Sequence, residues 1–376
     1  MGKNRVPTQH LRWFFLLLVF SSCHTIQRDL HISSIDESAR AELTEIERTI
    51  VRLEFAPAGN IINETRRKID TLANIPDPDF QTLLAAWSGR LFLLEGRSVE
   101  AQRELGRSQL RSRENWVSVI LASRLERDIQ RRMALLDAHI HNASLGNYAE
   151  EEGLGELHIE RGRILLEQNR FPEAVASFDL AFGLLEDKPF YQESYRFARD
   201  RAWNLRNIDE NMESRLVEIA AQDGISWLDL VEITKSETDL LRFLTAGRDW
   251  PNDEIFGRLL ERSFIPLTQN ITLTEWPQAR PLPDETVLRS GTAWFLWHLY
   301  AENRANRGFL SRYSSRYANI TDARSPVGDL PMNSPFFDSI LGCVEWEFMN
   351  LPDGRNFFPE QRVRGSIFLE MLKRLN

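Results

Sequence analysis

The chain contains very little cysteine. Its 376 residues include only Cys23 and Cys343, so a framework of several disulfides is excluded as the source of stability. With 42% hydrophobic residues, the chain can bury sizeable cores. Cys343 lies within an apolar helical pattern, which favours a core position. The sequence therefore predicts two or three domains that are stabilised by packing.

The chain also lacks a surplus of positive charge. Its formal net charge is −9, whereas a general nucleic-acid binder needs a basic face to hold phosphates. A long hydrophobic run is missing near the N-terminus, where the apolar stretch from Trp13 to Phe20 is too short to span about 30 Å of hydrocarbon. We therefore expect no nucleic-acid partner and no permanent membrane-spanning helix in this stretch.

Motifs of enzymes and metalloproteins are absent as well. The chain has no P-loop, nucleophile elbow or HExxH sequence, and Gly153-Leu154-Gly155 lacks the third glycine of a dinucleotide-binding fingerprint. His139, His141 and His158 have no cysteine or nearby carboxylate set to complete four metal ligands. We predict no catalysis, cofactor or metal. A wall-active hydrolase is a less favoured alternative, because it would need paired carboxylates in a cleft.

Residues 1–22 have the pattern of a secretory leader: a basic start, the apolar run and then two serines. The sequence Phe20-Ser21-Ser22-Cys23 resembles a bacterial lipobox, in which the cysteine is acylated and becomes the new N-terminus. The resemblance implies that Cys23 is lipidated, that residues 23–37 form a tether, and that the protein is anchored in the bacterial envelope, either periplasmic or surface-exposed. The alternative is an ordinary signal peptide cleaved nearby.

The stretch from His158 to Pro189 has the spacing of a helical hairpin. Its apolar residues recur at helical intervals on both sides of the polar turn 168–170. The small residues Gly162, Ala174 and Ala181 allow two helices to approach closely, and Phe178 is large enough to fill the groove between them.

This hairpin resembles the tetratricopeptide repeat, which has a small residue early in its first helix and an Ala-x3-Phe run in its second. A second copy contains Gly89 and Ala101, and its spacing is the same, since 101 − 89 = 12 and 174 − 162 = 12. Fainter copies cover residues 38–72 and the region around Ala122 and Ala134.

The resemblance implies an α-solenoid over residues 38–222, in which three to four hairpins stack and bury one another's apolar faces. A protein partner in the concave face of the solenoid is the function that this architecture implies. Residues 191–222 would cap the last repeat.

The composition changes after residue 223, where prolines gather and aromatic residues fall in short helical pieces. The final segment resembles an S-layer homology module. The matching residues are Phe337, Ile340, Val344, Phe348, Gly354, Phe358, Pro359 and Arg364. An upstream copy contains Phe256, Leu260, Phe264, Pro283 and Arg289. Together they imply a helical bundle over residues 223–376, with modules at about 223–318 and 319–376.

In that family the grooves of the bundle bind cell-wall polysaccharide, and a basic residue at the start of the second helix contacts the acidic sugar. By position the resemblance assigns this role to Arg289 and Arg364. A third, faint copy at 233–237 would assign it to Lys235, although residues 225–227 could equally begin that helix. We expect Arg289 and Arg364 to be exposed, and Phe348 and Phe358 to lie in the core. The alternative role for both arginines is a plain surface position.

The sequence as a whole predicts an all-α protein: a tetratricopeptide-like solenoid followed by a bundle of S-layer-homology-like modules. The predicted function is that of a lipid-anchored envelope scaffold that binds a protein partner. The alternative is a polysaccharide-binding envelope anchor in which the repeats only act as a spacer.

Overall fold

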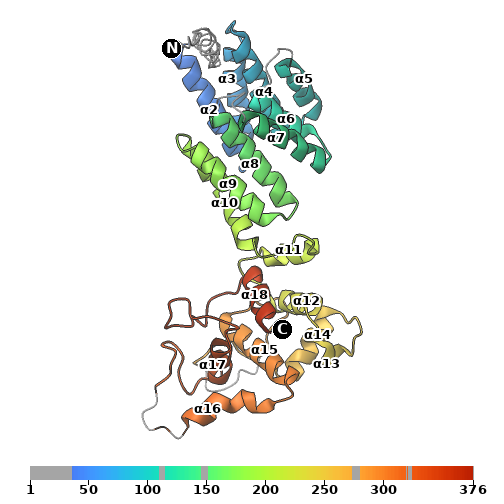
Figure 1. Ribbon diagram of the computed structural model, residues 1–376, viewed down its shortest axis with the longest axis vertical. Coiled ribbons are helices and arrows are strands. Elements are labelled where there is room, and N and C mark those ends of the chain that lie inside the picture. The colour runs from blue at the N-terminus through green and yellow to red at the C-terminus, as the bar shows by residue number, and fades with distance from the viewer. Residues whose placement is uncertain are drawn as a thin grey trace, which may run out of the picture. The chain divides into compact units, whose positions relative to one another are not determined.

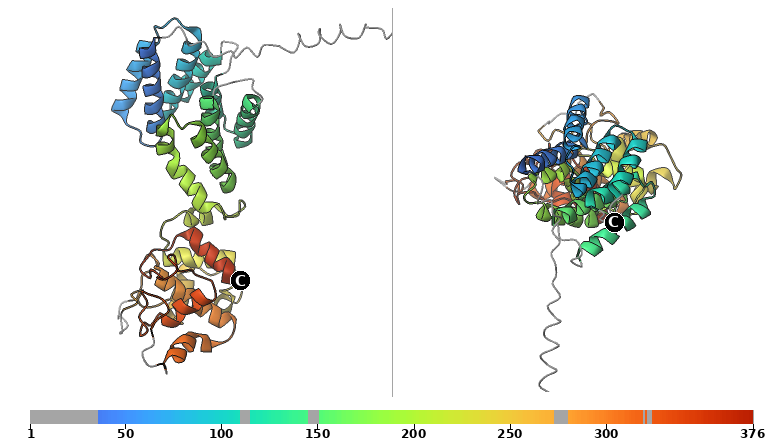
Figure 2. Two further views of the ribbon diagram at one scale, coloured as in Figure 1. Left: turned by 60° about the vertical axis from the view of Figure 1, so that its left-hand side comes forward. Right: turned by 90° about the horizontal axis from the view of Figure 1, so that it is seen from above.

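The computed structural model describes residues 36–109, 115–144, 151–272, 280–318, 320 and 324–375. All regular secondary structure in these ranges is helical, apart from two isolated bridges, Ser226 with Thr286 and Leu288 with Arg362. The prediction of an all-α protein is confirmed (Figures 1 and 2). The leader, Cys23 and most of the predicted tether lie outside the described residues.

The N-terminal half consists of consecutive helices. They are α2 (Glu37–Leu53), α3 (Gly59–Leu72), α4 (Pro78–Leu94), α5 (Ser98–Gln109), α6 (Trp116–Leu125), α7 (Ile129–Ser144), α8 (Glu151–Glu167), α9 (Phe171–Leu184) and α10 (Pro189–Leu205). The start of α4 shows how the sequence sets these bounds. Pro78 suits the first helical turn because it has no N–H to leave unpaired, and the Asp77 side chain accepts a hydrogen bond from Phe80 N at 2.9 Å.

The C-terminal half has shorter helices and longer connections, as the proline-rich composition indicates. They are α11 (Ser214–Ala220), α12 (Trp227–Glu237), α13 (Arg242–Thr245), α14 (Asn252–Glu261), α15 (Arg289–Asn303), the 3-10 helix η1 (Arg307–Ser311), α16 (Arg312–Tyr317), α17 (Phe337–Glu345) and α18 (Gly365–Leu375).

The chain forms two compact units. The first contains residues up to Ile164 together with Ser177–Tyr195, and the second contains Leu165–Ala176 together with Arg196–Asn376. The predicted boundary at residues 222 and 223 therefore falls within the second unit.

The small residues predicted for the hairpins are buried. A Cβ atom on Gly89 would lie 2.3 Å from Leu121 Cδ2 of α6, and one on Gly162 would lie 3.0 Å from the Phe178 ring of α9. Ala101, Ala174, Phe178 and Ala181 are also completely buried. These positions bring neighbouring helices into close contact, as their spacing indicates.

The faint repeat copy around Ala122 and Ala134 has a different register from the predicted one. Ala134 is exposed and Ala122 is half-buried, whereas Ser123 is completely buried. The small residue that approaches a neighbour in α6 is therefore Ser123, and the prediction was wrong by one residue. Val119, Ile120 and Leu121 are all buried as well, and a helix that is apolar on most sides leaves the register unspecified by periodicity.

Bulk added at Ala174 should test this packing. Ala174→Trp is expected to lower the free energy of unfolding by about 1–3 kcal/mol, because the ring must be forced into a fully packed site. The matched control is Arg170→Ala in the preceding turn, whose ion pair with Glu173 is partly exposed and should contribute little. Chemical denaturation of both variants measures the difference, and equal midpoints would contradict close packing at Ala174.

In the second unit, three extended segments meet immediately before α12, α15 and α18. Ile225 N donates to Val363 O at 3.1 Å, Val363 N donates to Val287 O at 3.3 Å, and Val287 N donates to Ile225 O at 2.9 Å. All three side chains are buried. We call this closed cycle the backbone ring. It fixes the starts of three helices around one buried point.

Because of the backbone ring, the first residues of the three helices occupy structurally equivalent positions. These residues are Trp227, Arg289 and Gly365, each two positions after its ring residue. Glycine is required at the third start because a Cβ atom there would lie 2.1 Å from the Ile219 carbonyl oxygen. The predicted match of Arg364 with Arg289 is therefore wrong by one residue.

The helices α14 and α17 end in the same way. Ser263 and Glu347 have left-handed φ values of 64° and 58°, and each is followed by a buried phenylalanine, Phe264 or Phe348. The predicted core position of Phe348 is confirmed. The prediction for Phe358 was wrong, because Phe357 is fully buried while Phe358 is half-buried.

Candidate functional site

Arg289 is buried, so the prediction that it is exposed was wrong. Its Nε donates to Phe357 O at 2.8 Å and its Nη2 donates to Asn350 O at 2.9 Å, while the guanidinium lies 4.6 Å from the centre of the Phe357 ring. Burial lowers the pKa of Arg289, against the opposing effect of Asp329. The segment that carries Asn350 and Phe357 thus covers the guanidinium, which serves to hold that segment in place.

Arg364 is exposed, as predicted, and directly precedes α18. Its Nε lies 3.1 Å from Asp223 Oδ1 and its Nη1 is 3.5 Å from Asn204 Oδ1. Half of its side chain is accessible to solvent. Of the three predicted polysaccharide-contacting residues, Arg364 therefore has the most accessible cationic side chain.

Lys235 lies in the last turn of α12, which contradicts the interpretation of 233–237 as a helix start. The helix begins at Trp227, where Ser226 and Asp229 form a reciprocal capping box. Lys235 Nζ donates to Trp250 O at 2.8 Å and pairs with Asp249. Among the residues that the structure describes, Arg289, Arg364 and Lys235 have no partner in common, so no shared contact joins them into a single basic cluster.

A second group of polar residues lies inside the first unit, where three arginines meet one carboxylate. Arg90 of α4, Arg124 of α6 and Arg163 of α8 approach Glu54 at the end of α2. Arg90 Nη2 is 2.7 Å from Glu54 Oε1, and Arg163 Nη1 is 3.8 Å from Glu54 Oε2. The Glu54 side chain is only 7% exposed. We call these four residues and their direct partners the buried charge network.

Further carboxylates and hydroxyls complete the buried charge network. Glu160 accepts from Arg124 Nη2 and Arg163 Nη1, both at 2.9 Å. Glu156 accepts from Arg90 Nη1 at 3.2 Å and from Trp116 Nε1 at 2.9 Å. Anions and cations thus alternate between helices, which is the arrangement that makes buried charges tolerable.

The helix α10, which is distant from α2 in the sequence, also contributes side chains to the network. Tyr195 donates to Glu54 at 2.5 Å, and Tyr191 donates to Glu47 at 3.0 Å. Lys188, just before α10, donates to both oxygens of Glu47 at 2.9 and 3.0 Å. The network therefore takes side chains from α2, α4, α6, α8 and α10, and it links these helices through hydrogen bonds and ion pairs.

The network shifts the ionisation of its members. Burial opposes the charge on Glu54, but Arg124, Arg90 and Arg163 outweigh it and lower the pKa of Glu54 below its usual range. Burial and the carboxylate of Glu156 raise the pKa of Glu47 to about 7, although Lys188 acts in the opposite direction. Each carboxyl group is bonded to protein groups, so the network is suited to holding helices together.

The positions of these arginines in the repeats indicate that they share a buried partner. Arg90, Arg124 and Arg163 each directly follow the small residue of their helix, Gly89, Ser123 or Gly162. A charged residue beside a close-packed position is unexpected on an apolar face, and its recurrence in three helices indicates a shared buried partner.

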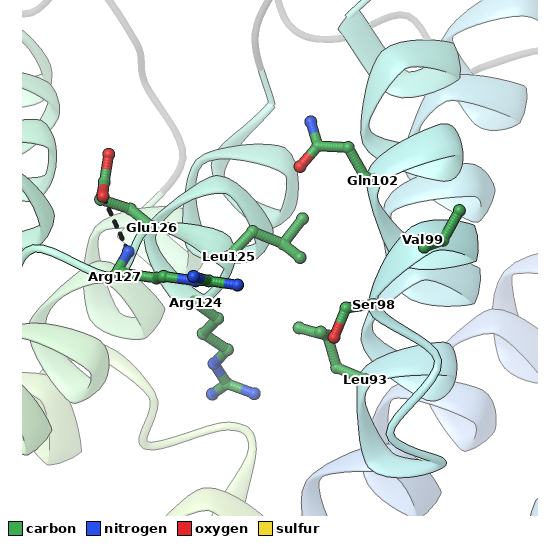
Figure 3. Close-up of a pocket in the computed structure, with 8 residues that line it drawn as sticks. All are labelled: Leu93, Ser98, Val99, Gln102, Arg124, Leu125, Glu126 and Arg127. Carbon is green, nitrogen blue, oxygen red and sulfur yellow. Dashed lines mark hydrogen bonds between the residues drawn. The ribbon is translucent and has the colours of Figure 1, made fainter.

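A surface cavity of about 510 Å³ opens between the α4–α5 turn and the end of α6. Figure 3 shows Leu93, Ser98, Val99 and Gln102 on one side and Leu125, Glu126 and Arg127 on the other. Val99 is 73% exposed. The Arg124 guanidinium is bound to Glu54 and Glu160, so its backbone and stem line the cavity while its charge belongs to the network.

Two of the three histidines for which the sequence predicts no metal binding have contacts to the protein itself. His139 Nδ1 is 2.8 Å from Leu135 O, and the buried His158 contacts Ser177. Within the described ranges, no group of histidine, cysteine and carboxylate side chains is arranged to hold a metal ion. In the same ranges, no helix combines the length and apolarity that crossing a bilayer requires.

Comparison of the chain with protein-family models, curated proteins and solved structures gives no match. The similarity to tetratricopeptide repeats and S-layer homology modules therefore rests on the residues quoted above.

Proposed function

We propose that this protein is a lipid-anchored component of the bacterial envelope that works by binding, with its helical hairpins as a scaffold for a protein partner. The stacking of α4 against α6 at Gly89 and of α8 against α9 at Gly162 is the observation that supports this function best. Stacked hairpins present an extended surface, and such surfaces are commonly used to bind other proteins.

We place the proposed partner at a different position from the concave face of the solenoid. Side chains of α2, α4, α6, α8 and α10 are bonded to one another in the buried charge network, so we assign the partner to the cavity beside Val99. Its lining combines the apolar side chains of Leu93, Val99 and Leu125 with Gln102 and Glu126. Such a mixture suits a segment of protein that inserts one or two apolar side chains and forms hydrogen bonds at the rim.

A photo-reactive residue at position 99 tests this assignment in cells. It should form one discrete cross-linked product, whereas the same residue at position 180 should not, although Leu180 is also half exposed in the first unit. The comparison of positions 99 and 180 controls for non-specific cross-linking at any exposed apolar position. Identical products from both positions, or none from position 99, would remove the cavity as the partner's site.

The proposed lipid anchor is tested separately through Cys23, the residue that would carry the acyl chains. Cys23→Ala is expected to move the protein from the detergent phase to the aqueous phase, since burial of acyl chains contributes about 0.8 kcal/mol per CH2 group. Detergent-phase partitioning of the variant measures the effect. A variant that partitions like the parent would show that acylation of Cys23 is not the anchor.

Polysaccharide attachment through the second unit is the second candidate function. The backbone ring supports it, because it relates three helix starts in the way that repeated modules would. Arg364 is then the residue to test, since removing the buried Arg289 would disturb folding. Parent protein should sediment with purified wall material, and Arg364→Ala should bind several-fold less while Arg374→Ala binds normally. Failure of the parent to sediment, or equal binding by all three proteins, would exclude this role for Arg364.

A further inference from the structure

The segment 303–318 carries four positive charges and no negative one, although the chain as a whole has a net charge of −9. It covers the end of α15, all of η1 and α16. The charged residues are Arg304, Arg307, Arg312 and Arg316, and we call them the arginine strip. A run of this kind in an acidic protein indicates an anionic ligand, because like charges that lie close together repel one another when nothing binds them.

The strip is accessible and largely unneutralised. All four arginines are exposed. Arg312 lies 3.9 Å from Glu345, whereas Arg304, Arg307 and Arg316 form no ion pair with any residue that the structure describes. The acidic residues beside the strip are Glu302, Glu345, Glu347 and Asp338, and the Asp338 carboxylate is bonded to the backbone nitrogens of Tyr313 and Ser314. Three guanidinium groups thus remain available to a ligand.

The strip is held firmly against the core of the second unit. Asp338 of α17 accepts hydrogen bonds from Tyr313 N at 2.6 Å and Ser314 N at 3.1 Å. Trp297 of α15 donates from its indole nitrogen to Phe309 O at 3.1 Å. The backbone of this segment is already ordered before a ligand binds. The entropic cost of association is therefore low.

An exposed indole lies beside the strip. Trp346 is 40% exposed and packs against Tyr300 at 5.1 Å and Phe309 at 6.2 Å between ring centres. The Arg304 guanidinium lies 5.4 Å from the centre of the Tyr300 ring. Trp346 and Arg304 thus both pack on the buried Tyr300 ring, and tryptophan and arginine are residue types found at the headgroup level of membranes.

We propose that the arginine strip and Trp346 dock the second unit onto a surface of anionic phospholipids. Separate exposed guanidinium groups suit a plane of phosphates, and the indole suits the boundary between headgroups and acyl chains. Each arginine near such a surface raises the partition coefficient roughly fivefold, so the strip alone binds weakly. A weak contact of this kind is effective in a chain that is already held at the membrane, because the local concentration of lipid is then high.

The proposal goes beyond scaffolding and does not depend on polysaccharide binding. Its test uses residues 24–376, which contain both units but neither the leader nor the acylated cysteine. Flotation with vesicles of phosphatidylcholine and phosphatidylglycerol is compared with flotation on phosphatidylcholine alone. The test variant is Arg304→Gln/Arg307→Gln/Arg316→Gln. The matched control, Arg67→Gln/Arg103→Gln/Arg131→Gln, removes the same charge from exposed positions in the first unit.

The parent and the control should float with the anionic vesicles and not with the neutral ones, and added salt should release both. The strip variant should partition roughly 100-fold less, and Trp346→Ala should also reduce binding. Equal binding by the strip variant and the control would overturn the proposal. So would binding to neutral vesicles at the same level, or salt-sensitive binding to acidic polysaccharide or nucleic acid without any binding to anionic vesicles.

Discussion

Glu54→Ala is expected to destabilise the first unit by about 3–5 kcal/mol, because it leaves buried arginines without their shared counter-ion. Arg90 is 2% exposed and Arg124 is 13% exposed, so water cannot replace the lost carboxylate. Tyr195 would also lose the acceptor of its hydroxyl hydrogen bond. The measurement is the free energy of unfolding from chemical denaturation, followed by circular dichroism.

The same helix offers the control for this prediction. Glu45 of α2 pairs with Arg48 at 2.8 Å, but 44% of the Glu45 side chain is exposed. Glu45→Ala should change the free energy of unfolding by less than about 0.5 kcal/mol. A comparable loss in both variants would mean that helix α2 is sensitive to any substitution and that the buried charge network has no special role.

Replacing the network's charges together should behave differently from removing one. Glu54→Leu combined with Arg90→Met and Glu156→Gln removes Arg90 together with both of its carboxylates, while Arg124 and Arg163 keep Glu160 as their partner at 2.9 Å. Apolar replacements of a buried ion cluster are often neutral or stabilising. If this triple variant regains stability lost in Glu54→Ala, the cost of the single change lies in the stranded charges and not in lost packing volume.

The sequence predicted the helices well because periodicity reports which face of a helix is buried. Gly89, Gly162, Ala174 and Phe178 were found from spacing alone, and all are buried as expected. Spacing does not report what a buried charged residue contacts. Glu54 meets Arg163, 163 − 54 = 109 positions later, only because α2 and α8 come together in the fold.

The positions of the basic residues in the second unit were predicted less well. The predicted helix start at 233–237 rests on similarity of amino-acid sequence to the family's motif, which does not determine backbone geometry. Lys235 lies in a Thr-Lys-Ser-Glu sequence that resembles the family's motif, yet α12 begins eight positions earlier, since 235 − 227 = 8. Arg364 occupies the position before its helix start because Gly365 is needed beside the Ile219 carbonyl. Long-range contacts of this kind leave no periodic trace in the sequence.

Phe348→Ala is expected to destabilise the second unit by about 3–5 kcal/mol, through lost burial and the cavity that remains. The ring is 3% exposed and packs 5.2 Å from the Tyr300 ring, so few surrounding groups can move in to fill the space. The measurement is again the free energy of unfolding from chemical denaturation.

Phe358→Ala is the matched control, since both phenylalanines were expected in the core but only Phe348 is buried there. Phe358 is half-buried and has a left-handed φ of 56°, which costs energy for any residue with a Cβ atom. Its truncation removes less buried surface and should cost about 1 kcal/mol, near the centre of the distribution for single substitutions. Phe358→Gly should recover part of that loss by relieving the strained backbone. If Phe358→Ala lowers the free energy of unfolding more than Phe348→Ala does, Phe358 is a core residue, as the sequence predicted. That result would contradict the position of Phe357 as the core residue of that loop.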